Sequence, residues 1–218
     1  MIEKSSGAVS IIGSSDGPTS VFIAGKRKKT IKQRLHKWSY EKRKKKCERQ
    51  ILPGIHTMDE VISYAKNTYG LTEVERDSKE YQLQFKELRA SFIMLYEPQL
   101  LEEYAERPIL KCKDEEGIKE FQRQFMLREQ KAAEVTEDQF PLNFHMLEKE
   151  EGDMHIQITF EERFGHIAGS FSSSGNQGKR YFSKMYKDVY RYYGVTEEDI
   201  KTSSKRYSNL IRALATKY

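Results

Sequence analysis

The apolar residues of this 218-residue chain change their spacing once, and the change predicts two kinds of secondary structure. Before residue 135 they recur every three or four residues, as on one face of a helix. The clearest example is the series Tyr81, Phe85, Leu88, Phe92 and Leu95. After residue 142 they alternate with polar residues, as in strands with one buried face. We therefore expect an α+β protein.

Start and stop signals divide the first half into helices. Thr57 with Glu60 three residues later is a capping-box pattern, and Gly70 is a typical helix stop. Ser78 repeats the start signal for a helix that ends before Pro98, and Asp114 opens another long helix. We expect a helical N-terminal half of the body over about residues 55–135.

Three segments of alternating residues follow: Leu142–Glu148, Met154–Phe160 and His166–Phe171. Turn residues separate them, which predicts a small three-stranded antiparallel meander. Such a meander needs a helical layer to bury one face. Two C-terminal helices are expected after it, the first ending at Gly194 and the second holding Leu210 and Ile211.

Charge is spread unevenly along the chain. Residues 26–49 carry thirteen Lys or Arg against two Glu, whereas the whole chain has a net charge of only +5. Ile31, Leu35 and Trp38 recur at spacings of four and three there, which predicts a narrow apolar stripe on a basic helix. We expect a leader-like segment over 1–25, a basic helical arm over 26–52, and a single α+β domain over 55–218.

The basic arm suggests an anionic partner. Clustered Lys and Arg release counterions from nucleic acid on binding, and Trp38 and Tyr40 can stack on bases or lie at a membrane surface. Alternatively, the helix docks its apolar stripe on the acidic remainder of the chain. The candidate anion-binding residues are Lys26, Arg27, Lys28, Lys29, Lys42, Arg43, Lys44, Lys45, Lys46, Lys179 and Arg180.

Lys179 and Arg180 follow a Ser/Gly-rich loop and begin a helix, where backbone N–H groups favour anions. The loop is only loosely similar to a phosphate-binding loop. Ser173 stands where the first glycine of that motif belongs, and Arg180 replaces its Ser or Thr. We interpret it as a hairpin-to-helix connection. An enzyme with a phosphate site at this loop is the alternative.

Residues 12–23 read Ile-Gly-Ser-Ser-Asp-Gly-Pro-Thr-Ser-Val-Phe-Ile. This segment resembles the signature of the β subunit of sodium-ion-translocating carboxylic-acid decarboxylases, with Ser14 where the family usually has glycine. The resemblance covers residues 8–25. It implies that Asp16 matches the sodium- and proton-coupling aspartate, and that Gly17, Pro18 and Thr19 belong to the same motif. The segment also fits two short strands around an Asp-Gly-Pro turn.

No stretch of the sequence is apolar over the roughly 20 residues that a membrane-spanning helix needs. Polar residues interrupt 8–25, and its positive charges follow the apolar part, unlike those of a signal peptide. Cys47 and Cys112 lie far apart, which indicates free thiols in a reducing compartment. We therefore expect a cytoplasmic protein without a membrane span.

Three histidines fall among the expected strands. The predicted turns place His155 and His166 at opposite ends of their hairpin, and His145 near His155 across the other one. Two such ligands make a poor metal site, so we expect neither metal nor cofactor.

These observations predict a non-enzymatic binding protein. Its basic arm would engage nucleic acid, a ribosome or an acidic protein surface. An accessory to, or relic of, a sodium-ion-translocating decarboxylase β subunit, associated with that decarboxylase complex, is the alternative.

Overall fold

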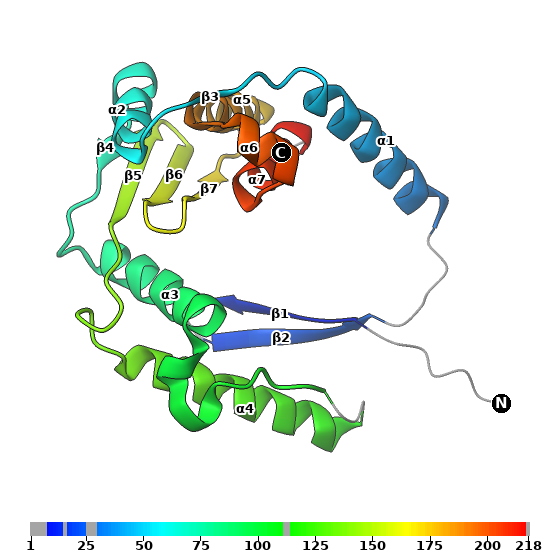
Figure 1. The fold of residues 1–218 in the computed structure, drawn as a ribbon, viewed down its shortest axis with the longest axis vertical. Helices are drawn as coiled ribbons and strands as arrows, with labels where there is room; N and C mark the ends of the chain where they lie inside the picture. Colours follow the sequence, from blue (N-terminus) through cyan, green and yellow to red (C-terminus); the bar gives the residue numbers. More distant parts are fainter. Residues whose placement is uncertain (1–7, 15–16, 25–29, 111–113, 217–218) are drawn as a thin grey trace. The chain divides into compact units, whose positions relative to one another are not determined.

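The computed structural model describes residues 8–14, 17–24, 30–110 and 114–216, the first two ranges by backbone alone (Figure 1). The chain is an α+β protein, as expected. It forms two compact units, of which unit 1 joins residues 1–28 to 76–142 and unit 2 joins 29–75 to 143–218. The division into 1–25, 26–52 and 55–218 stays a prediction.

The main sheet belongs to unit 2. Strands β5 (Phe144–Glu151), β6 (Met154–Glu161) and β7 (His166–Ser172) pair antiparallel in chain order. The prediction of a three-stranded sheet is wrong. The sheet has a fourth strand, β4 (Thr72–Glu73), which pairs with β5. A separate ribbon joins β3 (Gly54–Ile55) to β8 (Gly194–Val195). Strands of two residues are too short to show alternation in a sequence.

Helix α2 (Met58–Tyr69) begins and ends at the predicted residues. The Thr57 side chain accepts the Glu60 backbone N–H, and the Glu60 carboxylate accepts the Thr57 N–H in return. Gly70 follows with φ 65°, in the left-handed region that glycine adopts without steric cost. Capping thus fixes both ends of the helix.

Three helices follow the sheet, whereas two were expected. They are α5 (Asn176–Tyr193), α6 (Glu197–Thr202) and α7 (Lys205–Ala215). The additional one, α6, is a short helix that a capping box between Thr196 and Asp199 begins. The sequence predicts a turn at this point, and the turn continues as a short helix.

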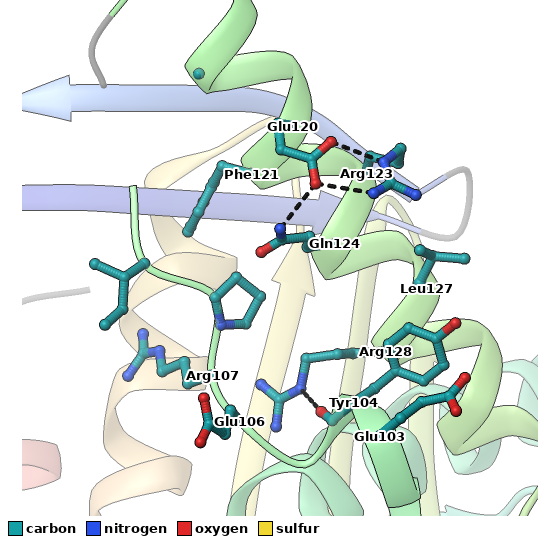
Figure 2. A pocket seen from close by; sticks show the side chains of 13 residues that line it. Glu103, Tyr104, Glu106, Arg107, Glu120, Phe121, Arg123, Gln124, Leu127 and Arg128 are labelled. Carbon is teal, nitrogen blue, oxygen red and sulfur yellow. Dashed lines mark hydrogen bonds and ion pairs between the residues drawn. The ribbon is translucent and has the colours of Figure 1, made fainter. Parts of the chain in front are cut away.

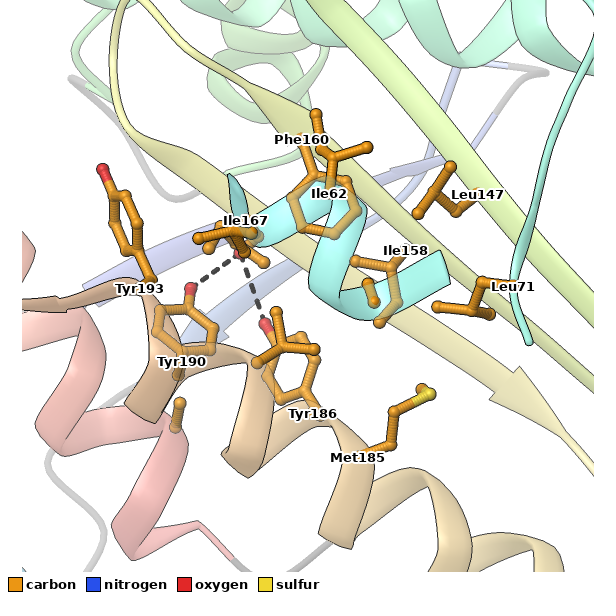
Figure 3. Packing of buried hydrophobic residues seen from close by; sticks show 14 of the residues in the cluster. Ile62, Leu71, Leu147, Ile158, Phe160, Ile167, Met185, Tyr186, Tyr190 and Tyr193 are labelled. Carbon is orange, nitrogen blue, oxygen red and sulfur yellow. Dashed lines mark hydrogen bonds between the residues drawn. The ribbon is translucent and has the colours of Figure 1, made fainter. Parts of the chain in front are cut away.

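The core of unit 2 lies between the sheet and α5 (Figure 3). Alternate residues of β6 are buried, as the sequence predicts. The hydroxyls of Tyr186 and Tyr190 donate to the Ile167 carbonyl at 3.3 and 2.7 Å, so α5 is hydrogen-bonded to β7. At Gly169 a Cβ would lie 2.9 Å from the Tyr186 ring, so this close packing requires glycine.

Unit 1 contains α3 (Lys79–Tyr96), the 3₁₀ helix η1 (Pro98–Tyr104) and α4 (Glu115–Glu134). The predicted caps Ser78 and Asp114 begin α3 and α4. Arg89 of α3 is buried and donates to the carbonyls of Phe140 and Val135 at 3.1 and 2.7 Å. These bonds hold the segment after α4 against α3.

The backbone of residues 8–24 forms a hairpin in the two parts that the structure describes. Strand β1 (Ala8–Ser14) pairs antiparallel with β2 (Gly17–Ala24), with an irregularity between Ile12 and Gly13. This pairing agrees with two strands around a turn. Among the described helices, none combines the length and apolar character needed to cross a bilayer.

Candidate anion-binding surface

Helix α1 (Ile31–Glu48) carries most of the described residues of the predicted site. The Thr30 side chain accepts the Gln33 N–H and the Gln33 side chain accepts the Thr30 N–H, which begins the helix within the predicted arm. Its 18 residues include eight Lys or Arg and two Glu, and none of them is buried. The helix therefore presents its charge to the surroundings.

Arg43 holds α1 against α7. Its Nε–H donates to the carbonyl of Ala215, the last residue of α7, at 2.7 Å, and its Nη1 donates to the Ser39 hydroxyl at 2.7 Å. The carbonyl end of a helix carries partial negative charge, which favours a cation there. Arg43, predicted to bind an external anion, thus anchors its own helix.

The prediction that the apolar stripe docks on the rest of the chain is wrong. The exposed fractions of Ile31, Leu35 and Trp38 are 77%, 60% and 63%. Residues 39, 40, 43 and 47, on the other side of the helix, are half-buried instead. Because the hydrogen bond from Arg43 to the Ala215 carbonyl directs that side to α7, the stripe faces outward.

The stripe and a row of cations share one face of α1. This face follows spacings of four and three along the helix: Ile31, Leu35, Trp38, Lys42, Lys45 and Arg49. Residues at these spacings lie above one another. The Lys42 ammonium lies 5.4 Å from the centre of the Trp38 ring. The outward face is therefore aromatic and apolar in its first half and cationic in its second.

A hollow of about 570 Å³ lies beside the cationic half. Its lining residues are Ser39, Lys42, Arg43, Lys45, Lys46, Arg49 and Gln50. Five of these seven side chains are cationic, and no described lining residue is acidic. Among the described residues, Lys44 is the one of the five predicted cations on α1 that forms an ion pair, with Glu48 at 3.8 Å. An anion in the hollow would offset the mutual repulsion of its cations.

Arg49 was missing from the residues predicted to bind anions, although it lines this hollow. The helical spacing would have identified Arg49, because it follows Lys42 by seven residues and therefore lies on the same face of the helix.

Lys179 and Arg180 are exposed in the first turn of α5 and do not line the hollow. The loop before them is fixed by the Asp153 carboxylate, which accepts the Ser174 N–H at 2.9 Å. Hydrogen bonds from Ser174 lower the pKa of Asp153, so this carboxylate stays charged. An acidic group thus already occupies one side of the loop.

Several other predicted site residues lie outside the described residues or are described by backbone alone. Asp16 and the run Lys26, Arg27, Lys28 and Lys29 lie outside the described residues. Gly17, Pro18 and Thr19 begin β2, described by its backbone.

The predicted proximity of His145 and His155 is wrong. The turn between β5 and β6 is short, so Glu151 pairs with Met154, His145 with Phe160 and His155 with Glu150. The two histidines therefore lie at opposite ends of this hairpin. His155 and His166 are likewise at opposite ends of theirs, as predicted. Within the described ranges, no cluster of three or more His, Cys, Asp or Glu is arranged to hold a metal ion.

No family model, curated protein or solved structure matches this chain.

Proposed function

We propose that this protein binds nucleic acid through the outward face of α1. The observation that carries the proposal is the hollow lined by five cationic side chains without a described carboxylate. Phosphates that enter such a surface release the counterions condensed on the nucleic acid, which supplies affinity with little dependence on sequence. The function is that of a binding protein, with no reaction assigned to it.

Trp38 favours nucleic acid over an acidic protein as the partner. Its ring is 63% exposed and lies on the same face as Lys42 and Lys45. Stacking of a base on an exposed aromatic ring contributes about 1–3 kcal/mol, and any base offers such a face. Acidic side chains of a protein would pair with the cations but would not stack on the Trp38 ring.

The docking of α1 supports binding by reducing its cost. Because Arg43 fixes the helix on α7, the helix itself does not have to be ordered when the ligand arrives. Ordering of groups at an interface opposes association. A docked helix therefore binds a phosphate chain better than a loose arm of the same composition.

Trp38 is the only tryptophan of the chain, so its fluorescence reports directly on the proposed surface. A short single-stranded oligothymidylate is titrated into the full chain at low salt, and saturable quenching is expected. Absence of any change would contradict the proposal. Polyglutamate serves as the comparison, because it offers negative charge without rings. Equal or tighter binding of polyglutamate would favour an acidic protein instead.

Charge-matched variants separate this surface from the net charge of the chain. Replacement of Lys42, Lys45 and Lys46 by Gln should weaken oligonucleotide binding about tenfold or more, since three phosphate contacts are lost. The control replaces Lys86, Lys119 and Lys201 by Gln, which removes the same charge from exposed positions elsewhere. Similar losses in both variants would show that binding does not reside on α1.

A further inference from the structure

Unit 1 contains a separate cleft of about 710 Å³ (Figure 2). One wall is a face of α4 that includes Phe121, Gln124 and Arg128, and the other is the segment 103–109, which comprises the end of η1 and the residues after it. This volume lies within the range of small-molecule sites, about 300–1,000 Å³.

Arg128 shapes the cleft and supplies a buried cation. Its side chain is 5% exposed, and its guanidinium donates to the carbonyls of Tyr104 and Ala105 at 2.7 and 3.1 Å. These bonds hold the segment beside α4. No carboxylate of the described residues forms an ion pair with Arg128 (Figure 2). A buried cation without a counter-ion is unfavourable, so a ligand anion here would be stabilising.

Arg107 adds a second positive charge. Arg107 and Arg128 both line the cleft, and burial together with the charge of Arg107 lowers the pKa of Arg128. Arg107 itself is exposed. An anion that contacts both groups would replace their repulsion by two charge-assisted hydrogen bonds.

Of the three carboxylates that line the cleft, Glu120 is engaged by other side chains. Glu120 accepts two hydrogen bonds from Arg123, at 2.8 and 2.9 Å, and one from Gln124 at 2.8 Å. These bonds lower its pKa to about 2, so it stays paired and ionised. Glu103 and Glu106 also line the cleft, and both are exposed.

The remaining walls are apolar. Phe121 and Leu127 of α4 and Pro108 and Ile109 of the facing segment line them. Aromatic rings pack well against a second ring in offset or edge contact. The cleft thus combines two cationic donors with a surface for a ring.

We infer that this cleft binds a small anionic ligand, one with a carboxylate or phosphate group on an apolar ring. Arg107 and Arg128 contact the anion, and Phe121 and Leu127 contact the ring. The inference is independent of nucleic-acid binding by α1, which lies in the other unit.

NMR titration of the ¹⁵N-labelled full chain tests the inference. The probes are benzoate and phenyl phosphate, with neutral benzamide as the comparison. Both anions should shift amide signals of residues 104–109 and 117–128, and benzamide should bind about tenfold more weakly because it lacks the charge. The tighter anion identifies which group the site prefers. Equal binding of benzamide, or shifts confined to other residues, would overturn the inference.

A pair of exposed variants completes the test. Arg107→Gln should weaken binding of the preferred anion about fivefold, since one charge-assisted contact is lost. Lys119→Gln removes one charge from the same α4 helix outside the cleft and should leave affinity unchanged. Unchanged affinity in Arg107→Gln, or an equal loss in both variants, would overturn the inference.

Discussion

Helices α1 and α5 are both 18 residues long and both rich in Lys and Arg, yet they have opposite environments. No residue of α1 is buried, whereas α5 buries seven, among them Phe182, Met185, Val189 and Tyr190. On α5 the apolar side chains occupy about two positions per turn and form a broad face. On α1 the apolar side chains occupy about one position per turn and form a narrow stripe. The width of the apolar face, more than charge, decides which helix enters the core.

The charges of the two helices also differ in their partners. On α5, Asp188 pairs with Arg191 at 2.5 Å and accepts the Tyr69 hydroxyl at 2.8 Å. On α1, the described residues that line the hollow with these cations include no Asp or Glu. Two basic helices of one protein thus have different surroundings: α5 packs into the core of unit 2, and the charge of α1 stays exposed.

The largest expected effect is on stability. Phe182→Ala removes a side chain that is 1% exposed and should lower the free energy of unfolding by about 3–5 kcal/mol. Trp38→Ala, an aromatic truncation on α1, should change it by less than about 0.5 kcal/mol. Urea unfolding followed by circular dichroism measures both. Comparable losses would refute the contrast between the helices.

Arg43→Ala tests whether α1 depends on its anchor. Loss of the bond to the Ala215 carbonyl should cost about 1–2 kcal/mol. Amide hydrogen exchange should quicken along α1 while α5 keeps its protection. Lys46→Ala removes an exposed charge from the same helix and serves as the control. If exchange in α1 were equal in the two variants, Arg43 would not hold the helix.

The tyrosines of α5 predict instability at alkaline pH. Burial raises the pKa of Tyr186 and of Tyr193 above the usual value near 10. Because the unfolded chain then loses these protons first, stability is complete below about pH 10 and falls as the pH rises above it. Urea unfolding at about pH 8 and about pH 11 measures this loss.

Tyr186→Phe tests the contribution of one of these hydroxyls. It removes a hydroxyl 3.3 Å from the Ile167 carbonyl, while Tyr190 keeps its bond at 2.7 Å. The expected cost at neutral pH is therefore about 1 kcal/mol or less, and the loss of stability at alkaline pH should become smaller. An unchanged alkaline loss would show that Tyr186 does not contribute to it.

Local chemistry made part of the fold predictable. The caps at Thr57, Ser78 and Asp114 and the stop at Gly70 depend on neighbouring residues, and the structure has all of them. The alternation of β6 likewise follows from one buried face. In the candidate site, the same reasoning identified α1 and four of the five cations that line the hollow.

The rest depends on contacts between distant parts of the chain. β4, β3 and β8 consist of two residues each and exist through their partners. The side of α1 that docks is set by Arg43 reaching the Ala215 carbonyl, a contact without a sequence signal. The cleft of unit 1 depends in the same way on Arg128 and two backbone carbonyls. The resemblance around Asp16, outside the described residues, stays a prediction.

The most direct test of the proposed role of α1 is the salt dependence of oligothymidylate binding. The logarithm of the binding constant falls with the logarithm of salt concentration by about 0.7 per phosphate neutralised on a single strand. Replacement of Lys42, Lys45 and Lys46 by Gln should therefore make this slope shallower by about 2. A slope equal to that of the unmodified protein would contradict phosphate binding by α1.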